Sequence, residues 1–201
     1  MSVQSIIETV EEADLAVAGQ AAEVRHHPVT RALGHMSDIA DQPPMLTLGA
    51  LVLTGGLLTG QRRVAETGGR LLASVALATA IKTVVKHMVV RTRPHVLADQ
   101  GRYETGWLGP TDGPHSSFPS GHTADAIAAA RALARVFPEA GLPAYAAAAA
   151  VAAIQIPRCA HYPSDVTAGA VVGIAAEALV HRAWSLVGQP DIASGRTGQE
   201  N

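Results

Sequence analysis

The sequence predicts an all-α fold, an antiparallel bundle of about six helices integral to a membrane. Three observations predict it. Hydrophobic residues make up 48% of the 201-residue chain and charged residues only 16%. Most of the apolar residues are small or aliphatic, and small residues let helices approach closely, as in membrane bundles, although an alanine-rich soluble bundle would look similar. Residues 42–61 carry no charge, a length at the low end for crossing a hydrocarbon core of about 30 Å.

Residues 1–42 are predicted to form amphipathic helices that cover the bundle or lie at a membrane interface. Within residues 3–24, apolar side chains such as Ile6, Ile7 and Val10 recur at loosely helical spacing among acidic residues. A second, short helix is expected over residues 28–40.

Residues 43–187 are predicted to form the helical bundle itself. Helices are expected over residues 45–61, 71–90, 123–136, 143–156 and 166–187, where apolar residues dominate. Arg62, Arg63 and Arg70 are placed in a short loop that joins the first two of these helices.

The connection between the second and third bundle helices is long and rich in glycine and polar residues. Residues 95–118 are expected to form an extended loop, part of a catalytic loop over residues 91–121, and long ordered loops are often functional. No strand is predicted, because the valine clusters are embedded in longer helical segments. Residues 188–201, rich in glycine and polar residues, are predicted to be a disordered tail.

Composition excludes several classes of protein. The formal net charge of −2 gives no electrostatic footprint for nucleic acid. Cys159 is the single cysteine, so neither an intrachain disulfide nor a thiolate metal cluster is expected. The first twenty residues are acidic and lack a long apolar core, which disfavours a cleaved secretory signal. The remaining alternatives are a cytosolic protein and a multi-pass membrane protein.

Three polar motifs are predicted to meet at one end of the bundle. Each stands at the end of an apolar segment, and alternating helix directions bring all three to the same side. The opposite end carries six arginines, at positions 62, 63, 70, 131, 135 and 182. Because cytoplasmic loops of membrane proteins are enriched in Lys and Arg, we expect an inner-membrane protein whose motif end faces the periplasm or exterior.

The first motif, Lys86-x6-Arg93-Pro94, supplies two cations. Seven residues are close to two helical turns, so the two side chains share a face if the helix extends that far. Arginine offers a planar fork to phosphate and lysine a compact charge.

The second motif, Pro119-Ser120-Gly121-His122, supplies a hydroxyl, room for close backbone approach and the free N–H groups of a helix start. Taken alone, it is better explained as a helix N-terminus capped by Ser120. Phosphate binding is favoured only by its conjunction with the other two motifs.

The third motif, His161-x3-Asp165, places an imidazole and a carboxylate one helical turn apart. A carboxylate fixes the imidazole tautomer and activates the other nitrogen as a nucleophile or base. Taken alone, the pair fits equally well a capping Asp and a packed His.

In this order the motifs resemble the type 2 phosphatidic-acid phosphatase family, which includes lipid phosphate phosphatases, bacterial acid phosphatases and vanadium haloperoxidases. The family pattern is K-x6-R-P, then P-S-G-H, then S-R-x5-H-x3-D. The chain has KHMVVRTRP, PSGH and HYPSD, and the resemblance covers roughly residues 45–185.

The resemblance implies a phosphohistidine mechanism and its site residues. His161 would attack phosphorus with Asp165 orienting it, and His122 would protonate the leaving oxygen and then activate water. The phosphate oxygens would be held by Lys86, Arg93, Ser120, Gly121, Gln155 and Arg158. No metal or other cofactor is expected, since fixed cations would supply the electrostatic stabilisation.

One position departs from the family pattern. The arginine expected six residues before His161 is Gln155, and the nearest cation is Arg158. A neutral amide still donates hydrogen bonds but without charge assistance. We hypothesise that Arg158 compensates, although Pro157 interrupts the local helix.

The expected function is hydrolysis of a lipid phosphate at a membrane: phosphatidic acid, phosphatidylglycerol phosphate or an isoprenyl mono- or diphosphate. The alternatives are a broad-specificity acid phosphatase, a vanadate-dependent haloperoxidase and an inactive membrane scaffold. The oligomeric state is left open by the sequence.

Overall fold

The computed structural model describes residues 2–109 and 113–187, and helices dominate both ranges. The α-helices are α1 (Val3–Val24), α2 (Pro28–Ser37), α3 (Gln42–Leu58), α4 (Arg62–Met88), α5 (Pro94–Gln100), α6 (Gly121–Val136), α7 (Gly141–Ile154) and α8 (Pro163–Val187). Short 3-10 turns are η1 (Asp38–Ala40), η2 (Gly113–His115) and η3 (Pro138–Ala140), and the strands are β1 (Val89–Arg91) and β2 (Thr105–Trp107). The tail predicted over residues 188–201 lies outside the described residues.

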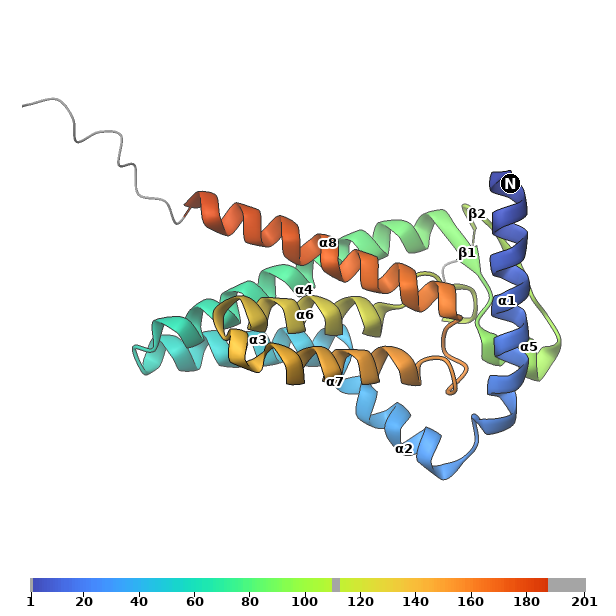
Figure 1. The fold of residues 1–201 in the computed structure, drawn as a ribbon, viewed down its shortest axis with the longest axis horizontal. Helices are drawn as coiled ribbons and strands as arrows, with labels where there is room; N and C mark the ends of the chain where they lie inside the picture. Colours follow the sequence, from blue (N-terminus) through green and yellow to red (C-terminus); the bar gives the residue numbers. More distant parts are fainter. Residues whose placement is uncertain (1, 110–112, 188–201) are drawn as a thin grey trace, which may run out of the picture.

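Helices α3, α4, α6, α7 and α8 run lengthwise in a bundle, and α1 lies across one end of it together with α5 and the two strands (Figure 1). Helix α6 occupies the middle, since it packs on α4, α7 and α8. Its alanines form much of the core: Ala124, Ala128 and Ala132 are fully buried. The sequence therefore predicted the helical class and the bundle correctly, but the described residues form eight α-helices where about six were predicted.

Glycines set the close packing of two helix pairs. A Cβ atom added to Gly56 of α3 would collide with the backbone of Ala65 in α4, and one added to Gly68 would collide with Leu53. Likewise, a Cβ atom on Gly169 of α8 would collide with the carbonyl oxygen of Ser120 at the start of α6. Close approach of α8 therefore helps to fix the position of the second motif.

Helix α4 begins earlier than predicted. The sequence placed Arg62, Arg63 and Arg70 in a loop, but all three lie inside α4. The turn is instead made by Gly60, whose φ of 68° is left-handed, with Gln61 N–H donating to the Gly56 carbonyl at 2.9 Å. This Schellman arrangement ends α3 within two residues, so the next helix begins at once.

The segment predicted as an open loop also contains regular structure. Strand β1 pairs antiparallel with β2, with Val89 opposite Trp107, although no strand was predicted. Pro94 stands at the first turn of α5, where a missing N–H costs nothing, and Gly101 ends that helix with a φ of 64°. Three-residue strands are too short for periodicity to reveal them.

Two helices, α4 and α8, are long and apolar enough to cross a membrane by length and composition, and α3 is a shorter apolar helix. Large apolar side chains such as Leu57, Leu58 and Leu142 are exposed on the outside of the bundle. These features are typical of a membrane protein.

Candidate active site

The three motifs meet at one end of the bundle, as the sequence predicted. They lie at the end of α4, the start of α6 and the connection from α7 to α8, all on the side that α1 crosses (Figure 1). Hydrogen bonds join the third motif to the second and to Ser117, which lies just before the second. The Ser120 N–H donates to the Asp165 carbonyl at 3.0 Å, and His161 Nδ1 lies 2.7 Å from the Ser117 carbonyl.

His161 is buried, with 3% of its surface exposed. Nδ1 is held by the Ser117 carbonyl, which fixes Nδ1 as the protonated nitrogen and leaves Nε2 with a free lone pair. No described residue hydrogen-bonds to that Nε2. Burial lowers the pKa of His161 to about 4, Asp165 opposes the shift, and the positive charges of Arg93 and Lys86 add to it. The imidazole is therefore neutral and nucleophilic at neutral pH.

Asp165 is fully buried in the first turn of α8 and supports His161 indirectly. Its Oδ2 lies 3.8 Å from His161 Nδ1, beyond hydrogen-bond distance. The same oxygen accepts from Ser117 Oγ at 2.5 Å and from the Tyr162 N–H at 2.9 Å. The carboxylate therefore orients the residues on both sides of the imidazole, while the Ser117 carbonyl holds the ring.

Arg91, which sequence reasoning missed as a site residue, completes this support. Its guanidinium donates to Asp165 Oδ1 and to Asp14 Oδ2, both at 2.8 Å, and stacks on the Tyr162 ring at 4.1 Å. Burial opposes the charged form, but the charge of Asp165 and the hydrogen bond that Arg91 donates to Asp14 raise the pKa of Arg91 overall. This pairing connects α1 to the motif end of the bundle. The only sequence feature that pointed to Arg91 was its position inside the first motif.

Lys86 and Arg93 are the two cations of the first motif. Lys86 Nζ donates to the Ser116 carbonyl at 2.6 Å. Arg93 Nε donates to the Gly113 carbonyl at 2.8 Å, and its Nη2 to the Ser116 carbonyl at 3.4 Å. Neither contacts a carboxylate among the described residues, so two partly buried positive charges remain unneutralised beside His161.

The second motif begins α6. Ser120 is the N-cap: its Oγ accepts from the Thr123 N–H at 3.4 Å and lies 2.9 Å from Thr123 Oγ1. Gly121 follows as the first helical residue, and first-turn N–H groups have no partner within a helix. Ser120 therefore caps the helix through the Thr123 N–H. The N–H groups of Gly121 and His122 are left available to an anion.

His122, in the same first turn, faces two carboxylates that sequence reasoning did not assign to the site. Its Nε2 lies 3.1 Å from Asp41 Oδ1 and 3.4 Å from Asp38 Oδ1. Both acids come from the segment that joins α2 to α3. Burial lowers the pKa of His122 overall, while the two carboxylates oppose that shift because they favour the protonated imidazole.

Arg158 and Gln155 both reach the end of α2. Arg158 Nη1 donates to Asp38 Oδ1 and Ser37 Oγ at 2.8 Å and to the Gly34 carbonyl at 2.9 Å. Burial opposes the ionised form of Asp38, but the hydrogen bond from Arg158 prevails and lowers the pKa of that carboxyl. Arg158 thus lies beside the acid that pairs with His122.

Gln155 is fully buried at the end of α7. Its amide nitrogen donates to Ser37 Oγ at 3.2 Å and to the Val151 carbonyl at 2.8 Å. Both amide hydrogens are therefore used, and the side chain as placed offers a phosphate no donor. Its backbone carbonyl accepts from the His161 N–H at 3.2 Å, so Gln155 positions the backbone of His161.

One cluster has the composition of a cation site. Ligand atoms of Asp38, Asp41 and His122 lie within 4.8 Å of one another. However, Arg158 already donates to the Asp38 oxygen that faces His122. We interpret the cluster as an ion-pair network that includes His122.

Asp125, one turn along α6 from His122, is fully buried and pairs with Lys82 of α4. The pair lies directly below the site, because an added Cβ atom on Gly121 would come within 3.4 Å of Lys82 Nζ. The charge of Lys82 is neutralised by this carboxylate and differs in that respect from the charges of Lys86 and Arg93.

The fold and these motifs are typical of a helical protein that acts on phosphate groups with two site histidines, His122 and His161. Residues 67–188, more than half of the chain, match the family model of the PAP2 superfamily, and the chain belongs to that superfamily. No protein of curated function matches the sequence.

Two solved structures share the fold. One is a transmembrane PAP2-type phosphatidylglycerolphosphate phosphatase from Bacillus subtilis, with a TM-score of 0.65 and 19% identity, covering 91% of this chain and 89% of its own. The other is LpxE from Aquifex aeolicus, with a TM-score of 0.58 and 20% identity, covering 84% of this chain and 94% of its own.

Proposed function

We propose that the protein is a phosphatase that hydrolyses a lipid phosphate through a phosphohistidine intermediate. The observation that carries the proposal is the Nε2 of His161, which has no hydrogen-bond partner among the described residues. It lies beside Lys86 and Arg93, two cations whose hydrogen bonds within the same part of the chain go to backbone carbonyls. A dianionic phosphate would supply the missing negative charge, and the nucleophile would already be neutral and oriented.

In the first step, the Nε2 lone pair of His161 forms a bond to phosphorus while the bond from phosphorus to the leaving oxygen breaks. His122 gives its proton to that oxygen, so the product leaves as a neutral alcohol rather than an alkoxide. Burial lowers the pKa of His122, and Asp38 and Asp41 oppose this shift and so help to keep the proton that the step requires.

In the second step, water attacks the phosphohistidine. His122, now neutral, accepts a proton from that water, and the electron pair of the breaking N–P bond returns to His161. Inorganic phosphate leaves, and both histidines regain their starting protonation states.

Stabilisation of the transition state would come from fixed groups in place of a metal. Lys86 and Arg93 would neutralise the phosphoryl oxygens, and Ser120 and the Gly121 N–H would donate hydrogen bonds to them. Arg158 would act on the His122 side, through Asp38. Its compensation for the arginine that Gln155 replaces stays a prediction.

A lipid phosphate is favoured as substrate by the setting of the site. The apolar helices α4 and α8 each contribute a motif residue at one end, Lys86 and Asp165. The Bacillus subtilis structure is a phosphatase of phosphatidylglycerolphosphate, which supports this substrate class. Phosphatidic acid, phosphatidylglycerol phosphate and isoprenyl phosphates all fit the same headgroup chemistry.

The proposed location is the inner membrane, with several spans and the site facing the periplasm or exterior. Arg62 and Arg63 begin α4, and Arg131 and Arg135 lie toward the far end of α6, opposite the site. The excess of positive charge at that end supports a cytoplasmic orientation for it.

Phosphate release from a panel of lipid phosphates, measured with EDTA present, tests the function. We expect the wild-type protein to remain active in EDTA and His161→Ala to lose activity to background. His87→Ala is the matched control, because His87 is exposed on α4 and bonds only to the Thr83 carbonyl. Activity lost in EDTA and restored by a divalent metal, or activity retained by His161→Ala, would contradict the mechanism.

A further inference from the structure

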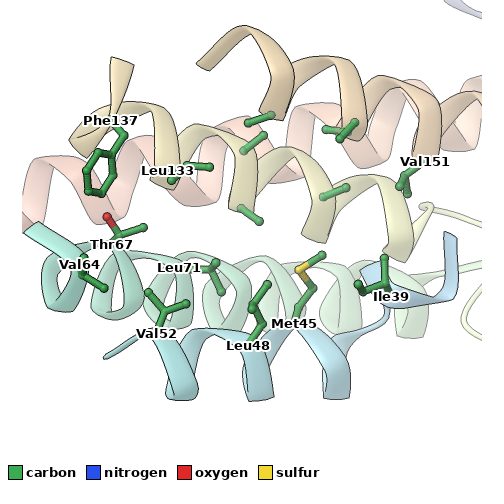
Figure 2. Close-up of a pocket in the computed structure, with 16 residues that line it drawn as sticks. Ile39, Met45, Leu48, Val52, Val64, Thr67, Leu71, Leu133, Phe137 and Val151 are labelled. Atoms are coloured by element: carbon green, nitrogen blue, oxygen red, sulfur yellow. The ribbon is translucent and has the colours of Figure 1, made fainter. Parts of the chain in front are cut away.

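An apolar groove of about 420 Å³ lies between α3 and α7, with α4 and α6 forming its floor (Figure 2). Leu48 and Val52 of α3 and Leu71 of α4 point into it. Thr67 is the one polar residue among the described residues that line it, and its hydroxyl donates to the Arg63 carbonyl at 2.9 Å. The groove therefore offers no hydrogen bond to an occupant and suits a hydrocarbon.

Small side chains create the space. The walls contributed by α6 and α7 consist largely of alanine, including Ala126, Ala130 and Ala148. Close-packed interiors normally leave few voids larger than a water molecule. A void of this size at a bundle face, lined by alanine where a leucine would fill it, indicates room kept for a ligand.

One end of the groove adjoins the active site. Ile39 lines it and directly follows Asp38, whose carboxylate faces His122. Val151 lines it and accepts a hydrogen bond from Gln155 at 2.8 Å. This end of the groove therefore lies next to the residues that flank His122, on the side where the leaving oxygen of a phosphoester would stand.

The other end is closed by Phe137, which follows α6 (Figure 2). The Arg63 guanidinium stacks on its ring at 4.4 Å and holds it in place. Ala126 and Phe137 are eleven positions apart along α6, so the groove runs for about 16 Å at 1.5 Å per residue.

We infer that this groove binds one hydrocarbon chain of the phosphate substrate, and that Phe137 limits the length of that chain. The inference rests on the proposed function, because it takes the substrate to be a phosphoester whose leaving group carries the chain. A chain in a bilayer is already surrounded by hydrocarbon, so moving it into the groove gives little hydrophobic free energy. Selectivity for one chain therefore comes from van der Waals packing in a groove of defined length.

A matched pair of variants on α7 tests the groove. Ala147 and Ala149 are both exposed alanines, but only Ala147 lines the groove, so Ala147→Phe fills it and Ala149→Phe adds the same atoms elsewhere. Activity is measured in nanodiscs on dipalmitoyl phosphatidate and on p-nitrophenyl phosphate, which has no chain. We expect Ala147→Phe to lower the ratio of the two kcat/KM values by about tenfold or more, and Ala149→Phe to leave it unchanged.

Phe137→Ala opens the far end and should shift the preference between dilauroyl and distearoyl phosphatidate toward the longer chain by about threefold or more. Equal lipid-to-p-nitrophenyl ratios in wild type, Ala147→Phe and Ala149→Phe would overturn the inference, as would an unchanged chain-length preference in Phe137→Ala.

Photolabelling separates failure of the groove from failure of the function. An alkyl phosphonate with a diazirine at the chain end should label Leu133 or Phe137 in the wild-type protein. Labelling without turnover of any phosphate would refute the proposed function and keep the groove. Turnover with labels only on the outward face of the bundle would refute the groove and keep the function.

Discussion

The two ends of the helical bundle hold their cations in opposite ways. At the far end, the buried carboxylate of Glu177 accepts from Arg131 Nε at 2.8 Å and from Arg135 Nε at 2.9 Å. At the site end, the hydrogen bonds of the Lys86 and Arg93 side chains within the described residues go to backbone carbonyls of the surrounding loop. The charges of the first group are neutralised by a carboxylate, whereas no described carboxylate contacts the second.

The contrast recurs within the first motif itself. Arg91 and Arg93 are two residues apart, yet Arg91 is neutralised by Asp14 and Asp165, and Arg93 is not neutralised by any described residue. A cationic side chain near a carboxylate stabilises structure, and one kept from carboxylates can bind an anionic ligand. The comparison predicts that mutations at the two ends affect different properties.

The largest effect is expected from removing a cation at the site end. Arg93→Ala should lower kcat/KM for phosphate release by about 10²- to 10³-fold, since single donors to a developing oxyanion are worth that much. The melting temperature should change little, because the lost hydrogen bonds go to loop carbonyls. Arg102→Ala is the control: Arg102 lies in the same segment but contacts Glu104 and His115. Similar rate losses in both variants would abolish the distinction.

At the far end, the expected effect is on stability. Glu177→Gln leaves two arginines without their buried carboxylate and should lower the free energy of unfolding by about 2–3 kcal/mol, with kcat/KM per folded molecule unchanged. Glu139→Gln serves as control, because Glu139 pairs with Arg63 at 3.9 Å with both side chains mostly exposed, and such pairs contribute under about 1 kcal/mol. Denaturant titration in detergent gives the difference, and a rate loss in Glu177→Gln would contradict this assignment.

The carboxylates on His122 should produce an intermediate effect. Asp41→Asn removes a negative charge 3.1 Å from Nε2, so protonated His122 becomes less favourable. For a substrate with a poor leaving group, kcat should fall by about tenfold, and the alkaline limb of the pH profile should move to lower pH. Asp99→Asn, an exposed acid paired with Arg25, should leave the profile in place. An unmoved alkaline limb in Asp41→Asn would assign Asp41 a structural role only.

Much of the fold followed from the sequence because its signals are local. The apolar and amphipathic segments predicted every long helix. The alternating directions of these helices predicted that the three motifs lie at one end of the bundle. The length of α4 and the strands β1 and β2 were missed, since they depend on a glycine turn and a three-residue pairing. Periodicity carries no information on features that short.

The sequence predicted that the motif residues lie together, but it did not predict the acids that pair with them. Asp14 meets Arg91 across 77 positions, and Asp38 meets His122 across 84. Both acids lie outside the segment that matches the family, residues 67–188. An isolated acid in an amphipathic helix resembles a solvated one until tertiary packing brings its partner to it. The motif pattern therefore specifies the groups proposed to bind phosphate, and the N-terminal segment supplies acids that contact Arg91 and His122.

The smallest expected effect is a shift in the pH dependence of activity. It distinguishes the effect of the positive charge of Arg93 from the effect of its side-chain shape. The pKa of His161 is lowered to about 4, chiefly by burial and further by Arg93, so the neutral nucleophile should persist down to that pH. The acid limb of kcat/KM for p-nitrophenyl phosphate, whose leaving group needs no proton, should therefore lie near pH 4, below the ordinary histidine value of about 6.5.

Arg93→Lys keeps the positive charge and should keep this limb in place while kcat/KM falls, because the planar fork is lost. Arg93→Ala removes the charge that disfavours protonated His161, so its limb should move upward, by less than about one pH unit because burial remains. The measurement is the acid limb of the residual activity in both variants. A limb that moves equally in Arg93→Lys and Arg93→Ala would mean that Arg93 acts on His161 through position alone, and its free charge would then have no part in tuning the nucleophile.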